Sequence, residues 1–131
     1  MQYINPESWP RPSGYTNGVI AEGRILSVAG QIGWNADGEF ESDDFLVQAT
    51  QALRNVVEVV RAAGGTPEQI VRLTWYVTDK HEYRAAAREL GAAYAEIVGL
   101  HYPAMTLVVV GALLEDRAKV EIEATAVLSP A

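Results

Sequence analysis

The chain has no cysteine, which excludes a disulfide framework, a thiolate nucleophile and a Cys-x-x-Cys metal site. Its first residues, Met1-Gln2-Tyr3-Ile4-Asn5-Pro6, do not show the basic and apolar pattern of a signal peptide. No window approaches an uninterrupted apolar run of about 18 residues, the length that a membrane-spanning helix needs. Its ten basic residues are scattered among 17 acidic ones, so no basic stripe is present to bind a phosphate backbone. Its two histidines, His81 and His101, are too far apart in sequence to suggest a metal site. These absences predict a cytoplasmic protein without a membrane, nucleic-acid or metal partner.

The 131 residues fall within the size of one domain, and we expect residues 1–131 to form a single unit with its own core. Two apolar runs, Val19–Ala21 and Ile25–Ala29, flank Glu22-Gly23-Arg24, a pattern typical of a β-hairpin. Further along, periodicity and turn residues predict helices over about 45–63 and 82–98, and strands over about 70–78, 104–110 and 119–128. The predicted order is ββαβαββ, an α+β fold.

The first predicted helix is amphipathic. Ser42-Asp43-Asp44 supplies an N-cap, and Gly64-Gly65 supplies a stop. Apolar residues at three- and four-residue spacing predict the buried stripe: Phe45, Ala49, Ala52, Leu53, Val56, Val57 and Val60. The polar residues are expected on the other side: Gln48, Gln51, Arg54, Glu58 and Arg61. The second helix is expected to turn Tyr83, Ala87, Leu90, Tyr94 and Ile97 inward.

Two helices can cover only one face of such a sheet. The run Leu107–Val110 predicts apolar side chains on both faces of its strand, so we expect the open face to be apolar. An exposed apolar face of this kind favours self-association. The alternative is that the segment Met1–Thr16 covers it.

The chain contains a series of short motifs in the following order: Gly14-Tyr15 with Gly18-Val19, Ala29-Gly30-Gln31-Ile32, Gln48-Ala49 with Asn55-Val56, Ala62-Ala63-Gly64, Val77-Thr78-Asp79, Tyr102-Pro103-Ala104 and Val120-Glu121-Ile122-Glu123-Ala124. Together they resemble the Rid family of small imine and enamine deaminases, also called the YjgF/YER057c/UK114 family, over residues 14–128. The resemblance implies a chorismate-mutase-like fold with both helices on one face of the sheet. It also implies a homotrimer with a central barrel and small-molecule sites between subunits. The implied reaction hydrolyses an imine or enamine without a cofactor or metal.

The resemblance assigns catalysis to Glu121, which matches the glutamate that positions the hydrolytic water. Glu121 and Glu123 share one face of their strand, and two nearby carboxylates raise at least one pKa, which suits general-base work. The alternative is that both carboxylates are merely solvated. The implied substrate-binding residues are Tyr15, Gly30, Gln31, Met105 and Thr106.

Two positions depart from the family pattern. Met105 stands where an arginine that binds the substrate carboxylate is usual, and Ala29 replaces a frequent serine. Met105 therefore favours a ligand with an apolar surface, although a methionine beside Leu107 can equally fill core or interface space. Arg88 on the second helix is one candidate replacement for the arginine. Trp34 is expected to line a larger, more apolar pocket or a subunit edge, and His101 to act at the same strand end or to lie exposed.

Three functions remain open. The first is hydrolytic deamination of a non-standard substrate, such as an aminomuconate-like enamine, through Glu121 and a bound water. The second is a noncatalytic small-molecule-binding trimer that lost the arginine. The third is an endoribonuclease or translation inhibitor, which the acidic charge argues against.

Overall fold

The computed structural model describes residues 1–130. Within them lie six strands, three α-helices and one short 3-10 helix. The strands are β1 (Gln2–Ile4), β2 (Gly18–Ile20), β3 (Arg24–Ile32), β4 (Ile70–Val77), β5 (Ala104–Val109) and β6 (Val120–Leu128), and the helices are α1 (Phe45–Ala62), α2 (Lys80–Ala85), α3 (Ala87–Ile97) and the 3-10 helix η1 (Pro67–Gln69). The α+β class predicted from the sequence is confirmed.

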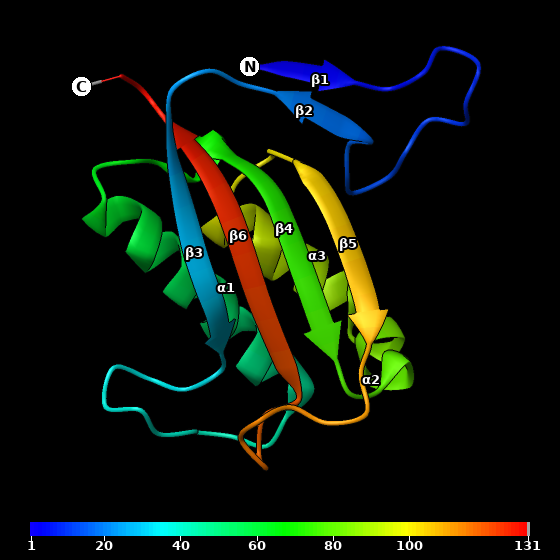
Figure 1. The fold of residues 1–131 in the computed structure, drawn as a ribbon. Coiled ribbons are helices and arrows are strands. Elements are labelled where there is room, and N and C mark those ends of the chain that lie inside the picture. The colour runs from blue at the N-terminus through cyan, green and yellow to red at the C-terminus, as the bar shows by residue number, and fades with distance from the viewer. Residues whose placement is uncertain (131) are drawn as a thin grey trace.

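Four strands form the main sheet in the order β3-β6-β4-β5. Strand β6 is antiparallel to β3 and β4, whereas β4 and β5 run parallel because the α2–α3 segment crosses over between them. All three α-helices lie on one face of this sheet, and the other face is uncovered (Figure 1). The expected single second helix is divided, because helical geometry breaks at Ala86 between α2 and α3.

The predicted β-hairpin is wrong. Strand β2 pairs with β1 in a separate two-stranded sheet, and β3 pairs with β6. The segment Glu22-Gly23-Arg24 therefore connects two sheets instead of closing a hairpin. Sequence reasoning also missed β1, whose three residues are all exposed and carry little strand periodicity. The two-stranded sheet lies beyond the ends of the main strands and does not cover the open face, as Figure 1 shows.

Helix α1 supplies most of the helical side of the core. Its N-cap is Asp44, whose carboxylate accepts a hydrogen bond from the Val47 amide at 3.1 Å. Gly64, with φ of 86°, ends it as predicted. The predicted stripe is buried against alternate residues of β4 and β6, which include Leu73 and Ile122. Each large apolar side chain buried in this way contributes about 1.5–3 kcal/mol.

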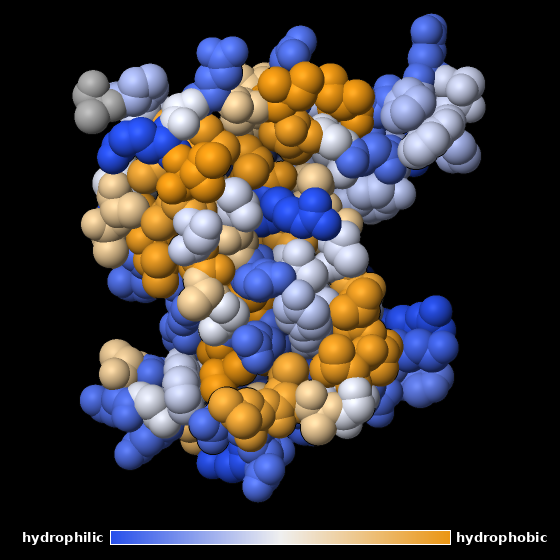
Figure 2. Space-filling model, in the orientation of Figure 1, coloured by the Kyte–Doolittle hydropathy of each residue, from blue (hydrophilic) through white to orange (hydrophobic). Residues whose placement is uncertain are grey.

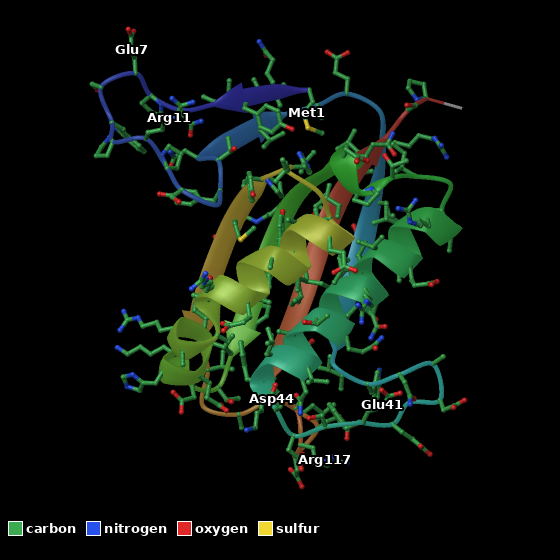
Figure 3. The ribbon with its side chains drawn as sticks, turned by 180° about the vertical axis from the view of Figure 1, so that it is seen from behind. Met1, Glu7, Arg11, Glu41, Asp44 and Arg117 are labelled. Atoms are coloured by element: carbon green, nitrogen blue, oxygen red, sulfur yellow. The ribbon has the colours of Figure 1, made fainter. Side chains whose placement is uncertain are left out.

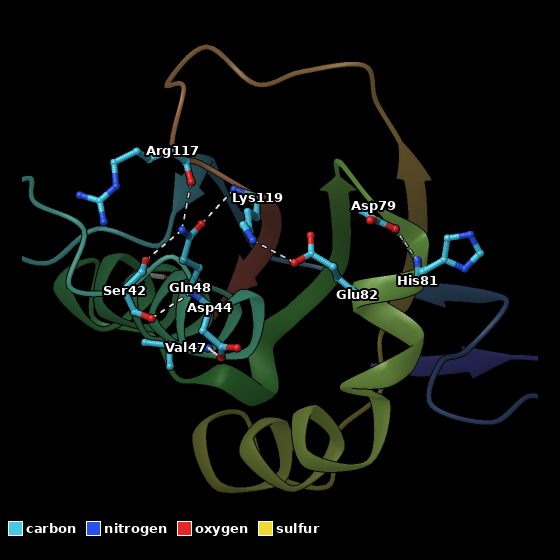
Figure 4. A network of polar contacts seen from close by, with 9 residues as sticks. All are labelled: Ser42, Asp44, Val47, Gln48, Asp79, His81, Glu82, Arg117 and Lys119. Carbon is cyan, nitrogen blue, oxygen red and sulfur yellow. Dashed lines mark hydrogen bonds and ion pairs between the residues drawn. The ribbon is translucent and has the colours of Figure 1, made fainter.

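Gln48 does not lie on the polar side of α1 as expected, because it is fully buried. Its Nε2 donates to the carbonyl oxygens of Ser42 and Arg117 at 3.1 and 3.0 Å, and its Oε1 accepts from the Lys119 amide at 2.9 Å. Figure 4 shows this side chain between the start of α1 and the segment leading into β6. Burial is tolerated because both ends of the amide group are paired. Gln48 thereby fixes the start of the strand that carries Glu121.

The open face of the sheet matches the apolar surface expected from the sequence only in part. Alternation along the strands places these polar residues there: Ser27, Arg72, Thr74, Tyr76, Thr106, Glu121, Glu123 and Thr125. Apolar exposure is found on edge strands, with Ile25 of β3 74% and Val108 of β5 40% exposed. Figure 2, which views this face, shows a hydrophilic band between hydrophobic areas. The apolar run 107–110 does place side chains on both faces, since Leu107 packs against the core and Val108 is exposed on the open face. The central strands, however, turn mostly polar residues outward.

Among residues 1–130, no helix has both the length and the apolar character needed to cross a bilayer.

Candidate functional site

A pocket of about 760 Å³ opens at the β5 edge of the molecule, on the side of the helices. This volume is in the range of small-molecule sites. Three parts of the chain form its wall: the loop between β1 and β2, the α2–α3 segment, and strands β4 and β5. Its lining includes Arg11, Tyr15, Trp75, Tyr83, Gly91, Tyr94, Tyr102 and Met105. Two predicted substrate-binding residues, Tyr15 and Met105, therefore lie in one pocket.

The loop that carries Tyr15 is held against the start of β5. The amide of Thr16 donates to the Pro103 carbonyl at 3.1 Å, and its hydroxyl donates to the Tyr102 carbonyl at 2.6 Å. The side-chain oxygen of Asn5 accepts from the amide and the side chain of Asn17, both at 2.9 Å. These contacts place Tyr15 in the same pocket as Met105, although 90 residues separate them in sequence.

The helical wall of the pocket is built around Tyr94. Its hydroxyl donates to the His101 carbonyl at 2.6 Å, and its ring stacks on Tyr102 with centroids 5.5 Å apart. Burial raises the pKa of Tyr94 well above its ordinary value, so the hydroxyl remains a donor at neutral pH. One turn earlier, Gly91 lacks a side chain, and a Cβ there would meet no atom within 4 Å. This glycine leaves space in the pocket wall.

The predicted catalytic residue, Glu121, lies elsewhere, on the open face of β6. It stands against Gly30 of β3, where an added Cβ would lie 2.8 Å from Glu121 Cδ and 2.9 Å from Cγ. Only glycine therefore accommodates this carboxylate position. Next along the strand, Glu123 accepts a hydrogen bond from the Tyr76 hydroxyl at 2.6 Å, and this bond raises the pKa of Tyr76. The Glu123 carboxylate is thus engaged within the sheet, whereas the Glu121 carboxylate accepts no hydrogen bond from residues 1–130.

The predicted site is divided between two places in one chain. Met105 lies on edge strand β5 and packs toward the helices, while Glu121 lies on β6 and faces away from them. Gly30 is on the opposite edge strand, β3, where the ladder to β6 shifts register between Val28 and Gln31. Tyr15 and Met105 form one group, and Gly30, Gln31 and Glu121 form the other.

Three predicted residues join neither the pocket nor its lining. Thr106 is exposed on the open face, opposite in direction to Met105. Trp34 contacts Phe40 with ring centroids 6.1 Å apart in the loop before α1. His101 is only 6% exposed, and its Nε2 donates to the Ile70 carbonyl at 2.7 Å while Nδ1 pairs with the Tyr3 hydroxyl at 2.7 Å. His101 is therefore a buried residue that holds β1 in place through its hydrogen bond with Tyr3.

Sequence reasoning missed two pocket residues and gave two others a different role. Arg11 is one of the missed residues, and its place between Pro10 and Pro12, just before the Gly14-Tyr15 motif, is the signal that could have identified it. Trp75 falls within the strand predicted over 70–78, and local spacing carries no signal that it lines a pocket. Tyr83 and Tyr94 were expected as core stripe, and they do contact the core as well as the pocket. Among residues 1–130, no cluster of three potential metal ligands is found.

The chain is similar in sequence to a known protein family and to several of its members. The family model described as Endoribonuclease L-PSP matches residues 8–128. A RutC family protein from Pyrococcus horikoshii is 32% identical over 126 residues, which cover 95% of this chain and 96% of that protein. The 2-iminobutanoate/2-iminopropanoate deaminase of Salmonella typhimurium is 34% identical over 125 residues, with 95% of both chains covered.

Two solved structures have the same fold over nearly the whole chain. A protein of unknown function of the conserved Rid protein family from Yersinia pestis has a TM-score of 0.83 and 40% identity, covering 97% of this chain and 98% of its own. TdcF from E. coli with bound serine has a TM-score of 0.72 and 30% identity, covering 98% and 100%.

Proposed function

The chain belongs to the family whose model is described as Endoribonuclease L-PSP, the Rid or YjgF/YER057c/UK114 family, and on that premise we propose that it hydrolyses an imine or enamine in clefts between subunits of a homotrimer. The substrate is a non-standard one, such as an aminomuconate-like enamine or another acid with an apolar body. An enamine first takes a proton on carbon to become the imine. Water then adds to the C=N carbon, the C–N bond breaks, and a 2-oxo acid and ammonia leave.

Glu121 holds the attacking water and accepts its proton. Tyr15 donates a hydrogen bond to the substrate, and Met105 contacts its apolar part. The deaminase name of the relative from Salmonella typhimurium supports this reaction class. The carrying observation is the division of the site: Tyr15 and Met105 line the pocket at β5, whereas Glu121 stands against Gly30 on the opposite face. A second copy that brings its Glu121 to the β5 pocket completes the cleft.

Met105 shifts the proposed specificity away from small imino acids. An arginine at this position would bind a substrate carboxylate with about 1.5–3 kcal/mol, or about one to two decades of affinity. A thioether supplies no such bond. The protein is therefore expected to be a poor 2-iminobutanoate deaminase, and Met105→Arg is expected to raise kcat/KM for that substrate by about 10- to 100-fold.

The test measures ammonia release from freshly generated 2-iminobutanoate and from 2-aminomuconate, with buffer alone as background. Turnover of aminomuconate that is lost in Glu121→Gln supports the proposal. Glu123→Gln is the matched control, because it makes the same change on the same face of β6 and retains an acceptor for Tyr76. Equal loss in both variants would refute a specific role for Glu121.

A noncatalytic binding trimer is the second candidate, favoured by the absence of polar side chains at both Met105 and Ala29. It predicts no turnover of either substrate by the wild type, with 2-iminobutanoate activity gained in Met105→Arg. The name of the family model raises ribonuclease activity as a minor third candidate. A net charge of −7 argues against it, and absence of RNA binding at low salt would exclude it.

A further inference from the structure

Arg11 and Trp75 are hydrogen-bond donors that line the β5 pocket and have no role in the proposed reaction. Arg11 lies on the loop between β1 and β2, which Figure 3 shows from the helical side of the molecule. Within residues 1–130 the ion pairs are Arg117–Asp43 and Lys119–Glu82, so Arg11 has no carboxylate partner there. The pocket therefore has one guanidinium free to bind an anion.

The backbone around Arg11 is restrained. Pro10 and Pro12 fix their own φ angles and restrict the residues before them. The Asn5–Asn17 hydrogen bonds close the loop, and Thr16 ties its end to Pro103. Less conformational freedom is lost when a ligand binds a side chain on such a loop. Arg88, the replacement considered from the sequence, does not line the pocket.

Trp75 gives the second observation. It is 3% exposed, and its Nε1 is the one buried side-chain nitrogen or oxygen in residues 1–130 without a hydrogen-bond partner. An unpaired buried donor retains its full desolvation penalty, which an acceptor on a ligand would remove. The ring also meets Tyr83 edge to face, with centroids 6.3 Å apart. Met105, which has a flexible side chain, lines the same pocket as Trp75.

We propose that the pocket binds a planar, aromatic 2-imino or enamine acid. Arg11 binds the carboxylate at the rim, in place of the arginine absent at position 105. The ring lies among Tyr15, Tyr83 and Met105, and an oxygen at its far end accepts a hydrogen bond from Trp75 Nε1. This assignment rests on the proposed function, because it names the substrate class of the same site.

Binding of stable 2-oxo acids tests the assignment independently of turnover. Titration calorimetry with the wild-type protein is expected to rank 4-hydroxyphenylpyruvate above phenylpyruvate, and both above 2-oxobutanoate. Arg11→Gln should weaken both aromatic acids by about 10- to 100-fold, since it removes a charge-assisted hydrogen bond. Arg88→Gln, with the same charge change outside the pocket, should leave both affinities unchanged.

Trp75→Phe should weaken 4-hydroxyphenylpyruvate by about fivefold or more and leave phenylpyruvate unchanged, so the second ligand reports whether the variant is folded. Unchanged affinity in Arg11→Gln, or tighter binding of 2-oxobutanoate than of the aromatic acids, would overturn the assignment. If Trp75→Phe fails to fold, the affinity ranking of the three acids on the wild-type protein still tests the contacts proposed for the ring and its oxygen. Aromatic binding without turnover of any imine would support this inference while refuting deamination. Turnover of small imino acids without binding of the aromatic acids would support deamination and refute this inference.

Discussion

Gly30→Ala moves the carboxylate of Glu121 without removing it. The added Cβ would lie 2.8 Å from Glu121 Cδ, whereas carbon atoms prefer about 3.5–4.0 Å, so the carboxylate must move by roughly 0.7 Å or more. A displacement near 1 Å in a catalytic arrangement costs about 100-fold in rate. We therefore expect kcat to fall by roughly 10- to 100-fold in the ammonia-release assay, with whichever substrate the wild-type protein turns over.

Stability should change little in this variant. Gly30 does not have a positive φ, and the displaced atoms belong to the flexible end of a side chain, so the unfolding free energy should change by less than about 1 kcal/mol. Gly111→Ala is the matched control, because its Cβ would meet no atom within 4 Å. Full activity in Gly30→Ala, or an equal loss in Gly111→Ala, would refute the reasoning that the position of Glu121 controls the rate.

Three further predictions concern the framework of the site. Gln48→Ala removes three buried hydrogen bonds and should lower the unfolding free energy in urea by about 3 kcal/mol, and a loss below about 1 kcal/mol would contradict the buried network. Tyr94→Phe should lower the unfolding free energy by about 1 kcal/mol at pH 7, where the hydroxyl donates to the His101 carbonyl. Because folding raises the pKa of Tyr94, the wild type loses this stability as pH rises above about 10, so thermal melts of the two proteins should converge there. Gly91→Ala, which adds a methyl group in open space within α3, should raise the unfolding free energy by about 0.5–1 kcal/mol in urea titrations, and destabilisation would show that the wall is already packed.

Periodic signals in the sequence predicted the main framework. The stripe of α1, the cap at Asp44 and the strands β4 to β6 follow from local spacing, and the structure confirms them within a few residues. Pairing partners are not local. The hairpin prediction failed because β2 pairs with β1, a three-residue strand without an apolar pattern.

The fate of single polar residues was also beyond local patterns. Local spacing predicted Gln48 on the exposed side of α1. It is buried because the distant segment near Arg117 and Lys119 packs over it. His101 was expected to act at the strand end or to lie exposed, but it is buried, and Tyr3 and Ile70 hold it from distant parts of the chain. Recognition of short motifs found Tyr15 and Met105, whereas Arg11 and Trp75 required the pocket itself.

The central claim is that one cleft takes Glu121 from one subunit and Tyr15 from another. Subunit mixing tests it most directly: Glu121→Gln and Tyr15→Ala proteins, each inactive alone, are unfolded together, refolded and assayed for ammonia release. Random assembly then restores about a quarter of the clefts, and the account predicts about a quarter of wild-type activity. No recovery from co-refolded protein, with wild type refolded in parallel fully active, would contradict a shared cleft.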